Sequence, residues 1–256
     1  KLQFCIGDTI NVIKENQIIP QVVENLTRSC GYVFPSACPV CGERAAIQKD
    51  NDSEVLVCTN PACRGKKIYR FVHFASRQCM NIEGLNEAAI RRFIIMGWLD
   101  AYADIYKLDA HKQELVQMKG YGSKYFENLW AAIQQSRTVR LENLIAALGI
   151  PLIGRHASRI LANRFEIWEN FEIALFEGFD FSKLNGIGIT LNDKLYSWYE
   201  HQFDEAVRLL PYLHVLPAQP ACKAGSLSGK RFALTGSLSM PRSQAKQMLE
   251  ARGAAV

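Results

Sequence analysis

The most informative part of the sequence reads Cys38-Pro-Val-Cys41 and, after a short loop, Cys58-Thr-Asn-Pro-Ala-Cys63. Two close cysteine pairs at such a spacing are typical of one tetrahedral zinc ion, because each pair ligates the metal from one turn and the chain between them folds back. Four thiolates leave no open coordination position, so the spacing predicts a structural Zn²⁺ site. Two disulfides or four unrelated thiols are the alternatives.

The chain on either side of the cysteines divides into further segments. Residues 1–35 carry two β-rich runs, which predict strands too few to be stable alone and indicate the tail of a β-barrel. Residues 36–72 form the zinc module, with a small hairpin predicted from the runs 45–49 and 54–57. The cations Arg64, Lys66, Lys67 and Arg70 follow the last cysteine and suit phosphate binding; a solvated basic edge is the alternative.

Residues 73–216 are expected to be mostly helical. Apolar residues at 141, 144, 145 and 148, and again at 160, 161 and 165, follow helical spacing. Residues 217–228 are rich in proline, glycine and serine and predict a linker. Residues 229–256 predict the start of a further α/β domain, with a strand at 231–235 and a helix at 243–252.

A degenerate repeat runs through the helical region at 82–86, 118–122, 148–154 and 184–188. Each piece places glycine and an apolar residue between helical segments, as helix–hairpin–helix DNA-binding motifs do. The glycines permit a tight turn, and the backbone N–H groups of the turn and following helix then face a phosphate without reading base sequence. For any single copy a plain helical turn is the alternative.

The residues expected to contact DNA are the glycines of the repeat and nearby cations. They are Gly84, Gly120, Gly122, Gly149, Gly154, Gly186 and Gly188, together with Arg77, Arg155, Lys66 and Lys67. The first copy has Asn86 where a second glycine is expected, the second has bulky Phe126, and the fourth has Asn192 where a small residue is usual. The third and fourth copies are therefore expected to contribute most.

Composition sets outer bounds on function. The 256 residues carry a net charge of +5, which permits a polyanionic partner. The remaining four cysteines show no disulfide framework and no signal peptide is present, so a reducing cytoplasm is expected. No apolar stretch is long enough for a bilayer, and no membrane partner is expected.

The order of these parts resembles the C-terminal half of a bacterial NAD-dependent DNA ligase. The residues that carry the resemblance are Ile19-Pro20-Gln21-Val22, Cys-Pro-x-Cys-Gly at 38–42, Cys-x-Asn-x-x-Cys at 58–63, His73-Phe-Ala-Ser-Arg77, Ile82-Glu-Gly-Leu85, Ala147-Leu-Gly-Ile150, and Gly229-Lys230 with Leu234-Thr-Gly236. The resemblance implies an OB-fold tail, a four-cysteine zinc finger, a helix–hairpin–helix domain and a partial BRCT domain. Residues 14–17 and Arg64-Gly65 depart from the family pattern.

What the family does follows from the same resemblance. Its members seal 5′-phosphate/3′-hydroxyl nicks in duplex DNA during replication and repair, using NAD and Mg²⁺. The adenylated lysine belongs to a domain before Lys1, so no catalytic residue is expected here and the fragment alone is expected to be an inactive monomer that clamps nicked DNA. A non-enzymatic DNA-binding module and a protein-interaction scaffold are the alternatives. His73 as a fifth metal ligand, His156 as a phosphate contact, and Thr235 and Gly236 as a terminal-phosphate site are weaker candidates.

Overall fold

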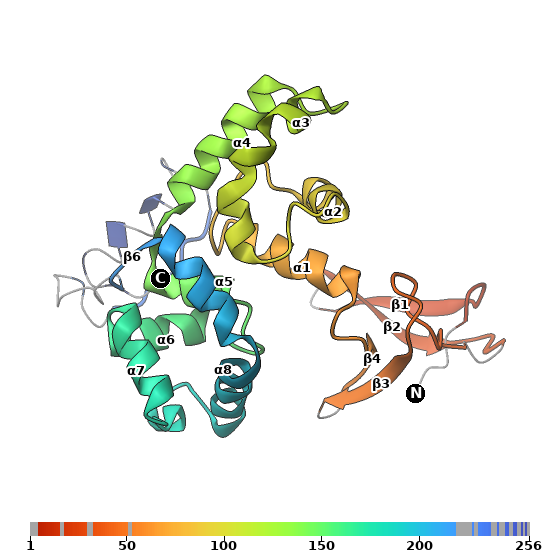
Figure 1. Ribbon diagram of the computed structural model, residues 1–256. Helices are drawn as coiled ribbons and strands as arrows, with labels where there is room; N and C mark the ends of the chain where they lie inside the picture. Colours follow the sequence, from red (N-terminus) through yellow and green to blue (C-terminus); the bar gives the residue numbers. More distant parts are fainter. Residues whose placement is uncertain are drawn as a thin grey trace. The chain divides into compact units, whose positions relative to one another are not determined.

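The computed structural model describes residues 5–15, 18–29, 33–50 and 53–218, and near the C-terminus residues 227, 230–236, 240, 244–245, 248–249, 252 and 254. The chain divides into two compact units, residues 1–67 and 68–256. It is mainly helical, with short two-stranded sheets (Figure 1). None of the helices in the described ranges is both long and apolar enough to cross a bilayer.

The first unit is built from two antiparallel hairpins. Strand β1 (Ile10–Glu15) pairs with β2 (Ile19–Asn25), and β3 (Ala45–Asp50) pairs with β4 (Ser53–Cys58). Both predictions of strands in these segments are confirmed. Each sheet has two strands, so the described residues do not close a barrel. The side chains of β1 and most of β2 are exposed, as expected for a ribbon with no third strand to cover it.

The second unit is a succession of helices, which confirms the helical prediction for residues 73–216. Helix α1 begins in the first unit and continues into the second. The elements are α1 (Arg64–Ala75), α2 (Glu87–Ile95), η1 (Tyr102–His111), α3 (Lys112–Gln117), α4 (Ser123–Ser136), α5 (Leu141–Ala147), α6 (Arg155–Phe165), α7 (Trp168–Phe176), η2 (Phe181–Lys183), α8 (Ile189–Leu209) and η3 (Leu210–Tyr212).

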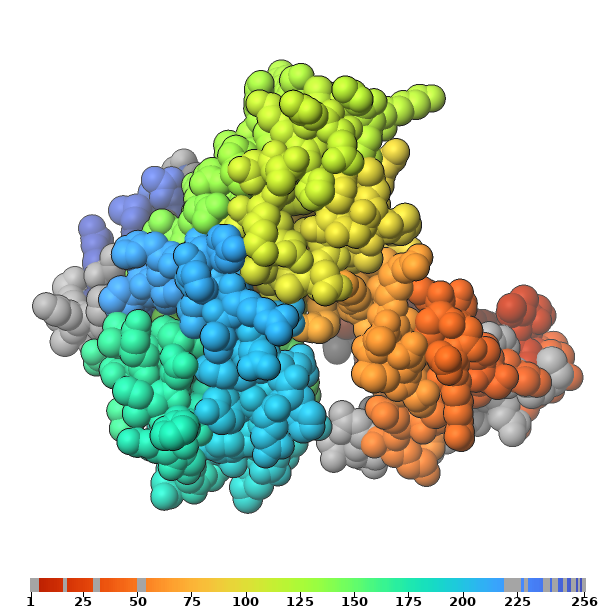
Figure 2. All heavy atoms as spheres, viewed as in Figure 1, coloured from red at the N-terminus to blue at the C-terminus, as the bar shows by residue number. Residues whose placement is uncertain are grey.

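One hydrophobic cluster runs through the second unit. The periodic residues of α5 and its end, Leu141, Leu144, Ile145 and Leu148, are all buried, and so are Leu161 and Phe165 of α6. Phe181 is fully buried among the rings of Phe165, Phe171 and Phe179 and so holds the turn before α8 onto α6 and α7. In the space-filling view the teal and blue spheres of α6 to α8 pack closely against one another (Figure 2).

Segments that are distant in the sequence contact one another within the second unit. Strand β5 (Thr138–Arg140) pairs in parallel with β6 (His214–Leu216). The Arg137 guanidinium donates to the carbonyls of Tyr106 and Tyr212, both at 3.2 Å. Arg70 of α1 forms an ion pair with Glu205 of α8, whose carboxylate also accepts from the Tyr102 amide. The Arg70–Glu205 ion pair joins α1 to α8, and the β5–β6 pairing and the Arg137–Tyr212 hydrogen bond join the segment after α4 to the segment after α8.

The C-terminal segment differs from the sequence prediction. A strand was expected at 231–235, but residues 232–235 have no strand pairing, and only Arg231 takes part in a bridge. Gln244, Ala245, Met248 and Leu249 are helical, in agreement with the helix expected at 243–252. Of the expected linker 217–228, residues 219–226 and 228 lie outside the described residues.

Four turns of the second unit share one backbone design. In each, the amide of the fourth residue donates to the carbonyl of the first, and the third residue has positive φ, as in a type II turn. The amide-to-carbonyl pairs are Leu85–Ile82 at 3.3 Å and Tyr121–Met118, Ile153–Ile150 and Ile187–Leu184 at 3.0 Å. The sequence repeat is therefore a structural repeat. These four turns, at 82–85, 118–121, 150–153 and 184–187, are called hairpins 1 to 4 in the order of the chain.

The third turn corrects the sequence alignment of the repeat. Gly84, Gly120 and Gly186 occupy the positive-φ position in the other turns, but here that position is held by Leu152, with φ +65°. Gly149 also has positive φ, yet it lies three residues earlier and ends α5. Pro151 at the second turn position was the available sequence signal, because proline favours that position of a type II turn.

The left-handed backbone at Leu152 makes a stability prediction. A side chain in this region costs about 1–2 kcal/mol, whereas at ordinary positions glycine is less stable than alanine by about 0.5–1 kcal/mol. The Leu152 side chain is 57% exposed and contributes little burial. We expect the free energy of unfolding, measured by urea denaturation, to be about 1 kcal/mol higher for Leu152→Gly than for Leu152→Ala.

Tryptophan fluorescence is a suitable readout for this comparison. All four tryptophans lie at 98, 130, 168 and 198, within the second unit. The reverse order, with the alanine variant the more stable, would show that this turn does not keep its left-handed residue in solution.

Candidate metal centre and nucleic-acid interface

The four predicted cysteine ligands come together in the first unit. All four Sγ atoms lie within 4.8 Å of one another, with Cys38–Cys63 at 3.9 Å and Cys41–Cys58 at 3.6 Å. A tetrahedral ion with bonds of about 2.3 Å requires sulfur–sulfur separations of about 3.8 Å. A disulfide requires about 2.05 Å, and the four cysteines are free thiols here. The arrangement fits a single thiolate-bound metal ion.

Local backbone geometry prepares the first pair of ligands. The Val40 amide lies 3.5 Å from the Cys38 sulfur and donates to it, and Gly42, with φ +77°, returns the chain so that its amide donates to the Cys38 carbonyl at 2.9 Å. Glycine tolerates this left-handed backbone without strain. Strand β4 ends at Cys58 and so delivers the third ligand from the hairpin that the sequence predicted.

Without a metal, the cysteine thiols of the cluster differ in their pKa values. Donation from the Val40 amide lowers the pKa of the Cys38 thiol to about 7, whereas burial raises the pKa of Cys58 to about 12. Four thiolates in one small space repel one another, and a divalent cation removes that repulsion and favours full deprotonation.

His73 is not a member of this cluster, which among the described residues contains the four cysteines alone. Its Nε2 donates to the Ala146 carbonyl at 2.8 Å and lies 3.6 Å from the Cys79 sulfur. The hydrogen bond with Cys79 raises the pKa of His73 to about 9. These contacts lie within the second unit and give His73 a structural role there.

Three helices of the second unit begin at a glycine N-cap. Gly122 precedes α4, Gly154 precedes α6 and Gly188 precedes α8, each with extended backbone and no side-chain cap. All three glycines are exposed. The first N–H groups of these helices therefore have no side-chain acceptor and carry the positive end of the helix dipole toward solvent.

The helix that follows hairpin 1, in contrast, has a side-chain cap at its N-terminus. Asn86 caps α2, and its side-chain oxygen accepts from the Ala89 amide at 3.0 Å. The Tyr125 hydroxyl donates a hydrogen bond to the Gly84 carbonyl at 2.8 Å. Asn86 therefore supplies a side-chain acceptor at this helix end, and Tyr125 of α4 contacts the turn, which gives the Asn86 departure a physical reason.

The glycines expected to contact DNA have two distinct roles. Gly84, Gly120, Gly149 and Gly186 have positive φ and form turns, whereas Gly122, Gly154 and Gly188 leave helix ends open. A Cβ atom on Gly186 would lie 2.6 Å from the Ile160 side chain of α6, so hairpin 4 sits directly on the helix that follows hairpin 3. Nothing lies within 4 Å of a Cβ at Gly122, Gly154 or Gly188.

The other departures from the motif also have structural reasons. Phe126 is buried, and its ring stacks near Trp130 inside the core. Asn192 accepts from the Phe181 amide at 3.0 Å and so ties α8 to the turn that precedes it. Both residues serve packing of the helices around their hairpins.

The expected cations differ in how freely they can meet a phosphate. Arg155, the first residue of α6, and His156 are exposed beside hairpin 3. Lys66 and Arg77 are exposed, and Lys67 is half-buried near the start of α1. Arg70 is engaged by Glu205 and does not belong with the cations available to a ligand.

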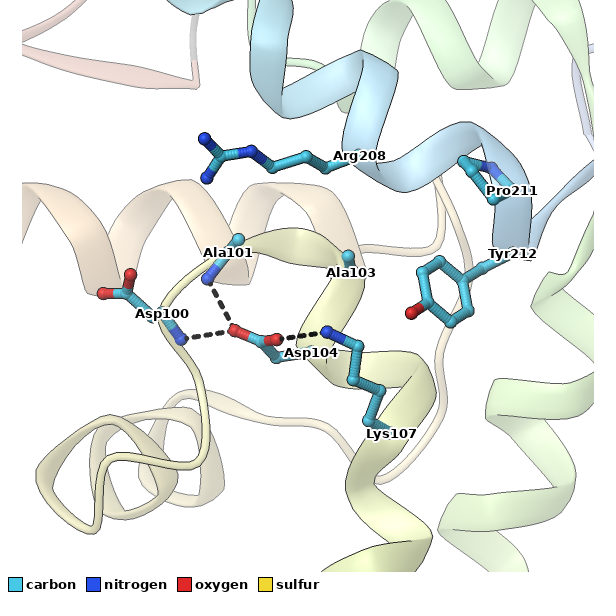
Figure 3. A pocket seen from close by; sticks show the side chains of 8 residues that line it. All are labelled: Asp100, Ala101, Ala103, Asp104, Lys107, Arg208, Pro211 and Tyr212. Atoms are coloured by element: carbon cyan, nitrogen blue, oxygen red, sulfur yellow. Dashed lines mark hydrogen bonds and ion pairs between the residues drawn. The ribbon is translucent and has the colours of Figure 1, made fainter.

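A separate recess of about 430 Å³ lies between η1 and the end of α8, and its charged residues are balanced between acids and cations (Figure 3). The Asp104 carboxylate accepts from the amides of Asp100 and Ala101 and pairs with Lys107 at 3.1 Å. Lys107 also lies over the Tyr212 ring at 5.7 Å. Two acids face two cations, with Arg208 the second, so this recess has no net charge to attract a phosphate.

Comparison with known protein families supports the hairpin geometry. A family model described as a helix-hairpin-helix motif matches residues 143–207, which contain hairpins 3 and 4 with α6 to the greater part of α8. These are the two hairpins that the Gly186–Ile160 approach brings together.

Curated relatives match the chain from end to end. Proteins named DNA ligase from Lachnoclostridium phytofermentans and Ruminiclostridium cellulolyticum are 33% and 32% identical over the whole chain, and one from Natranaerobius thermophilus is 34% identical over 98% of it. The chain spans only about 40% of the length of these relatives. It is thus homologous to a part of proteins that carry this name.

The cysteine cluster predicts one tightly bound zinc ion per chain. Cys41→Ser removes one of four ligands, so it should lose stoichiometric zinc and speed amide hydrogen exchange in β3 and β4, because metal-binding free energy is folding free energy in a small module. Elemental analysis of freshly reduced protein measures the metal.

Cys5→Ser is the matched control, since Cys5 lies in the same unit but outside the cluster. It should keep its zinc. Unaltered, reduced protein without a stoichiometric metal would contradict the metal-centre interpretation.

Proposed function

We propose that this chain is the DNA-binding portion of a bacterial NAD-dependent DNA ligase, an enzyme that joins a 5′-phosphate to a 3′-hydroxyl at a nick in duplex DNA. The observation that carries the proposal is the set of exposed glycine-capped helix ends at Gly122, Gly154 and Gly188. The relatives named DNA ligase favour this over a non-enzymatic DNA-binding module or a protein-interaction scaffold.

The open helix ends bind phosphate through backbone donors. A phosphate oxygen at Gly154 or Gly188 accepts from the first N–H groups of α6 or α8, and the helix dipole favours its negative charge. The side chains of Ile153 and Ile187 are buried and anchor their turns in the core. The backbone N–H donors at the following helix ends are therefore already oriented before DNA binds. Arg155 adds a full charge beside the third hairpin.

This mode of binding does not depend on base sequence. Contacts to phosphate oxygens position a protein on the duplex but carry no base information. A ligase must act at any nick, so non-specific clamping is the property that this portion of the enzyme has to supply. Hairpins 3 and 4 are its main contacts, hairpin 2 contributes through Gly122, and hairpin 1 is structural.

The remaining parts of the proposal follow the family resemblance. Residues 1–35 are the tail of an OB-fold, 36–72 a zinc finger, 73–216 the helix–hairpin–helix domain, 217–228 a linker and 229–256 the beginning of a BRCT domain. The metal at the cysteine cluster is structural Zn²⁺. The whole enzyme is a cytoplasmic monomer that uses NAD and Mg²⁺ outside this chain.

Closing the open helix ends should weaken DNA binding. In Gly154→Asp and Gly188→Asp the new carboxylate caps its own helix and repels phosphate, while the open surroundings allow the side chain to fit. We expect each variant to lose at least about tenfold in affinity, since a hydrogen bond to a charged group contributes about 1.5–3 kcal/mol, with thermal stability unchanged or raised. Fluorescence anisotropy on two unrelated nicked duplexes measures the affinity.

Asn86→Asp is the matched control for these variants. It adds the same charge at a helix end that is already capped, so affinity should hardly change. If Gly154→Asp and Gly188→Asp fold correctly and bind DNA like the unaltered chain, the hairpins are structural turns and DNA clamping by this unit is refuted.

The chain alone should form no covalent intermediate with NAD. None of its lysines stands in the Lys-x-Asp-Gly setting of the family's adenylated nucleophile, and an unactivated lysine is a poor nucleophile. Incubation with NAD and Mg²⁺ should leave the mass of the protein unchanged. A stable AMP adduct on any lysine would place part of the chemistry in this chain.

A further inference from the structure

A second polar recess, of about 310 Å³, lies beside hairpin 3. Its lining residues come from the segment after α1, from the start of α5 and from α6; they are Gln78, Arg140, Glu142, Asn143, Ala146, Arg155 and Arg159. We infer that this arginine recess binds a phosphate of the same DNA strand whose neighbouring phosphate occupies hairpin 3. The inference rests on the proposed function and extends it to a second site.

Three arginines from two elements line this recess. Arg155 and Arg159 are one turn apart on the same face of α6, and Arg140 precedes the first residue of α5. Guanidinium groups suit phosphate because their planar donors pair with two oxygens at once. Asn143 and Gln78 add neutral amide donors at the same opening.

These arginines are not used to hold the fold. Arg70 is paired with Glu205, and Arg137 donates to two backbone carbonyls. Within the described part of the chain, Arg140, Arg155 and Arg159 form no ion pair, and all three are exposed. Grouping three unpaired like charges costs electrostatic free energy, which an anionic ligand would recover.

The recess keeps a positive charge despite one acid. Glu142 is the single acidic residue among its lining residues, against three arginines. One oxygen of Glu142 is out of contact with water and has no hydrogen-bond partner. The recess of Figure 3, by contrast, balances two acids with two cations. Of these two recesses, the one beside hairpin 3 is therefore the one that attracts an anion.

The position of the recess favours a DNA phosphate over a free one. Arg155 both lines the recess and directly follows the open cap at Gly154. Phosphates of one strand are about 3.4 Å apart along the duplex axis, so a strand held at hairpin 3 has further phosphates close by. A strand that crosses the start of α6 can meet both sites.

The test uses cations that are not part of the hairpin. In the double variant Arg140→Gln, Arg159→Gln, the slope of log K against log salt should become shallower by about 0.9, the value for one neutralised phosphate. The loss in affinity at low salt should be equal on unrelated duplex sequences. Arg140→Lys, Arg159→Lys keeps the charge and should keep the slope.

Arg208→Gln is the matched control, because Arg208 is also an exposed arginine without an ion pair in the described part of the chain but lines the neutral recess. It should leave the slope unchanged. Titration of inorganic phosphate, followed by NMR of the arginine side-chain N–H groups, reports on a free anion.

The outcomes separate this inference from the proposed function. If the double Gln variant keeps the slope of the unaltered chain, the recess holds no DNA phosphate and the inference is overturned, while DNA binding by the hairpins stands. Loss of inorganic phosphate binding with an unchanged slope also overturns it and identifies a site for free phosphate. If the unaltered chain binds no DNA, the proposed function fails and this inference fails with it.

Discussion

One backbone constraint recurs through the second unit: each of the four turns places a left-handed residue directly before an apolar or aromatic side chain, which is buried at Leu85, Ile153 and Ile187 and half-buried at Tyr121. The apolar residue, such as Ile153 or Ile187, enters the core, and the left-handed residue reverses the chain so that the next residue can start a helix from an extended conformation. Because the apolar residue is buried and the N-cap that follows it is exposed, the helix end faces solvent. The same turn therefore anchors the core and exposes the first backbone N–H groups of the helix.

The four turns show how one design divides between structure and binding. Hairpin 1 caps its helix with the Asn86 side chain, and its Gly84 carbonyl accepts from the Tyr125 hydroxyl, so both of these groups have partners within the protein. Hairpins 3 and 4 keep glycine at the cap and leave their donors free for an external acceptor. The close approach of Gly186 to the Ile160 side chain packs hairpin 4 against α6, which follows hairpin 3. The proposed phosphate sites at these two hairpins would then lie close together on neighbouring elements and could hold a duplex between them.

Charge plays a supporting part in this surface. Backbone donors hold no full charge and release few counterions, so binding through them depends weakly on salt. Arginines beside hairpin 3 supply the full charges, whereas Arg70 and Arg137 are engaged in the fold. Arginine therefore has two roles in this unit, and the hydrogen bonds and ion pairs of each arginine show which role it has.

Features that depend on residues a few positions apart could be predicted from the amino-acid sequence. The cysteine pairs, the strands of both hairpins, the helical region and the four repeated turns were all evident from neighbouring residues, because metal ligation, pleat and helix periodicity act over a few positions. Other features depend on contacts between segments that are distant in the sequence. Leu152 takes a glycine's place, Asn86 closes its own helix, and Arg140 meets Arg159 only after α5 packs on α6. Of the strand predicted at 231–235, only Arg231 takes part in a bridge, because strand pairing depends on a partner that the segment's own residues do not include.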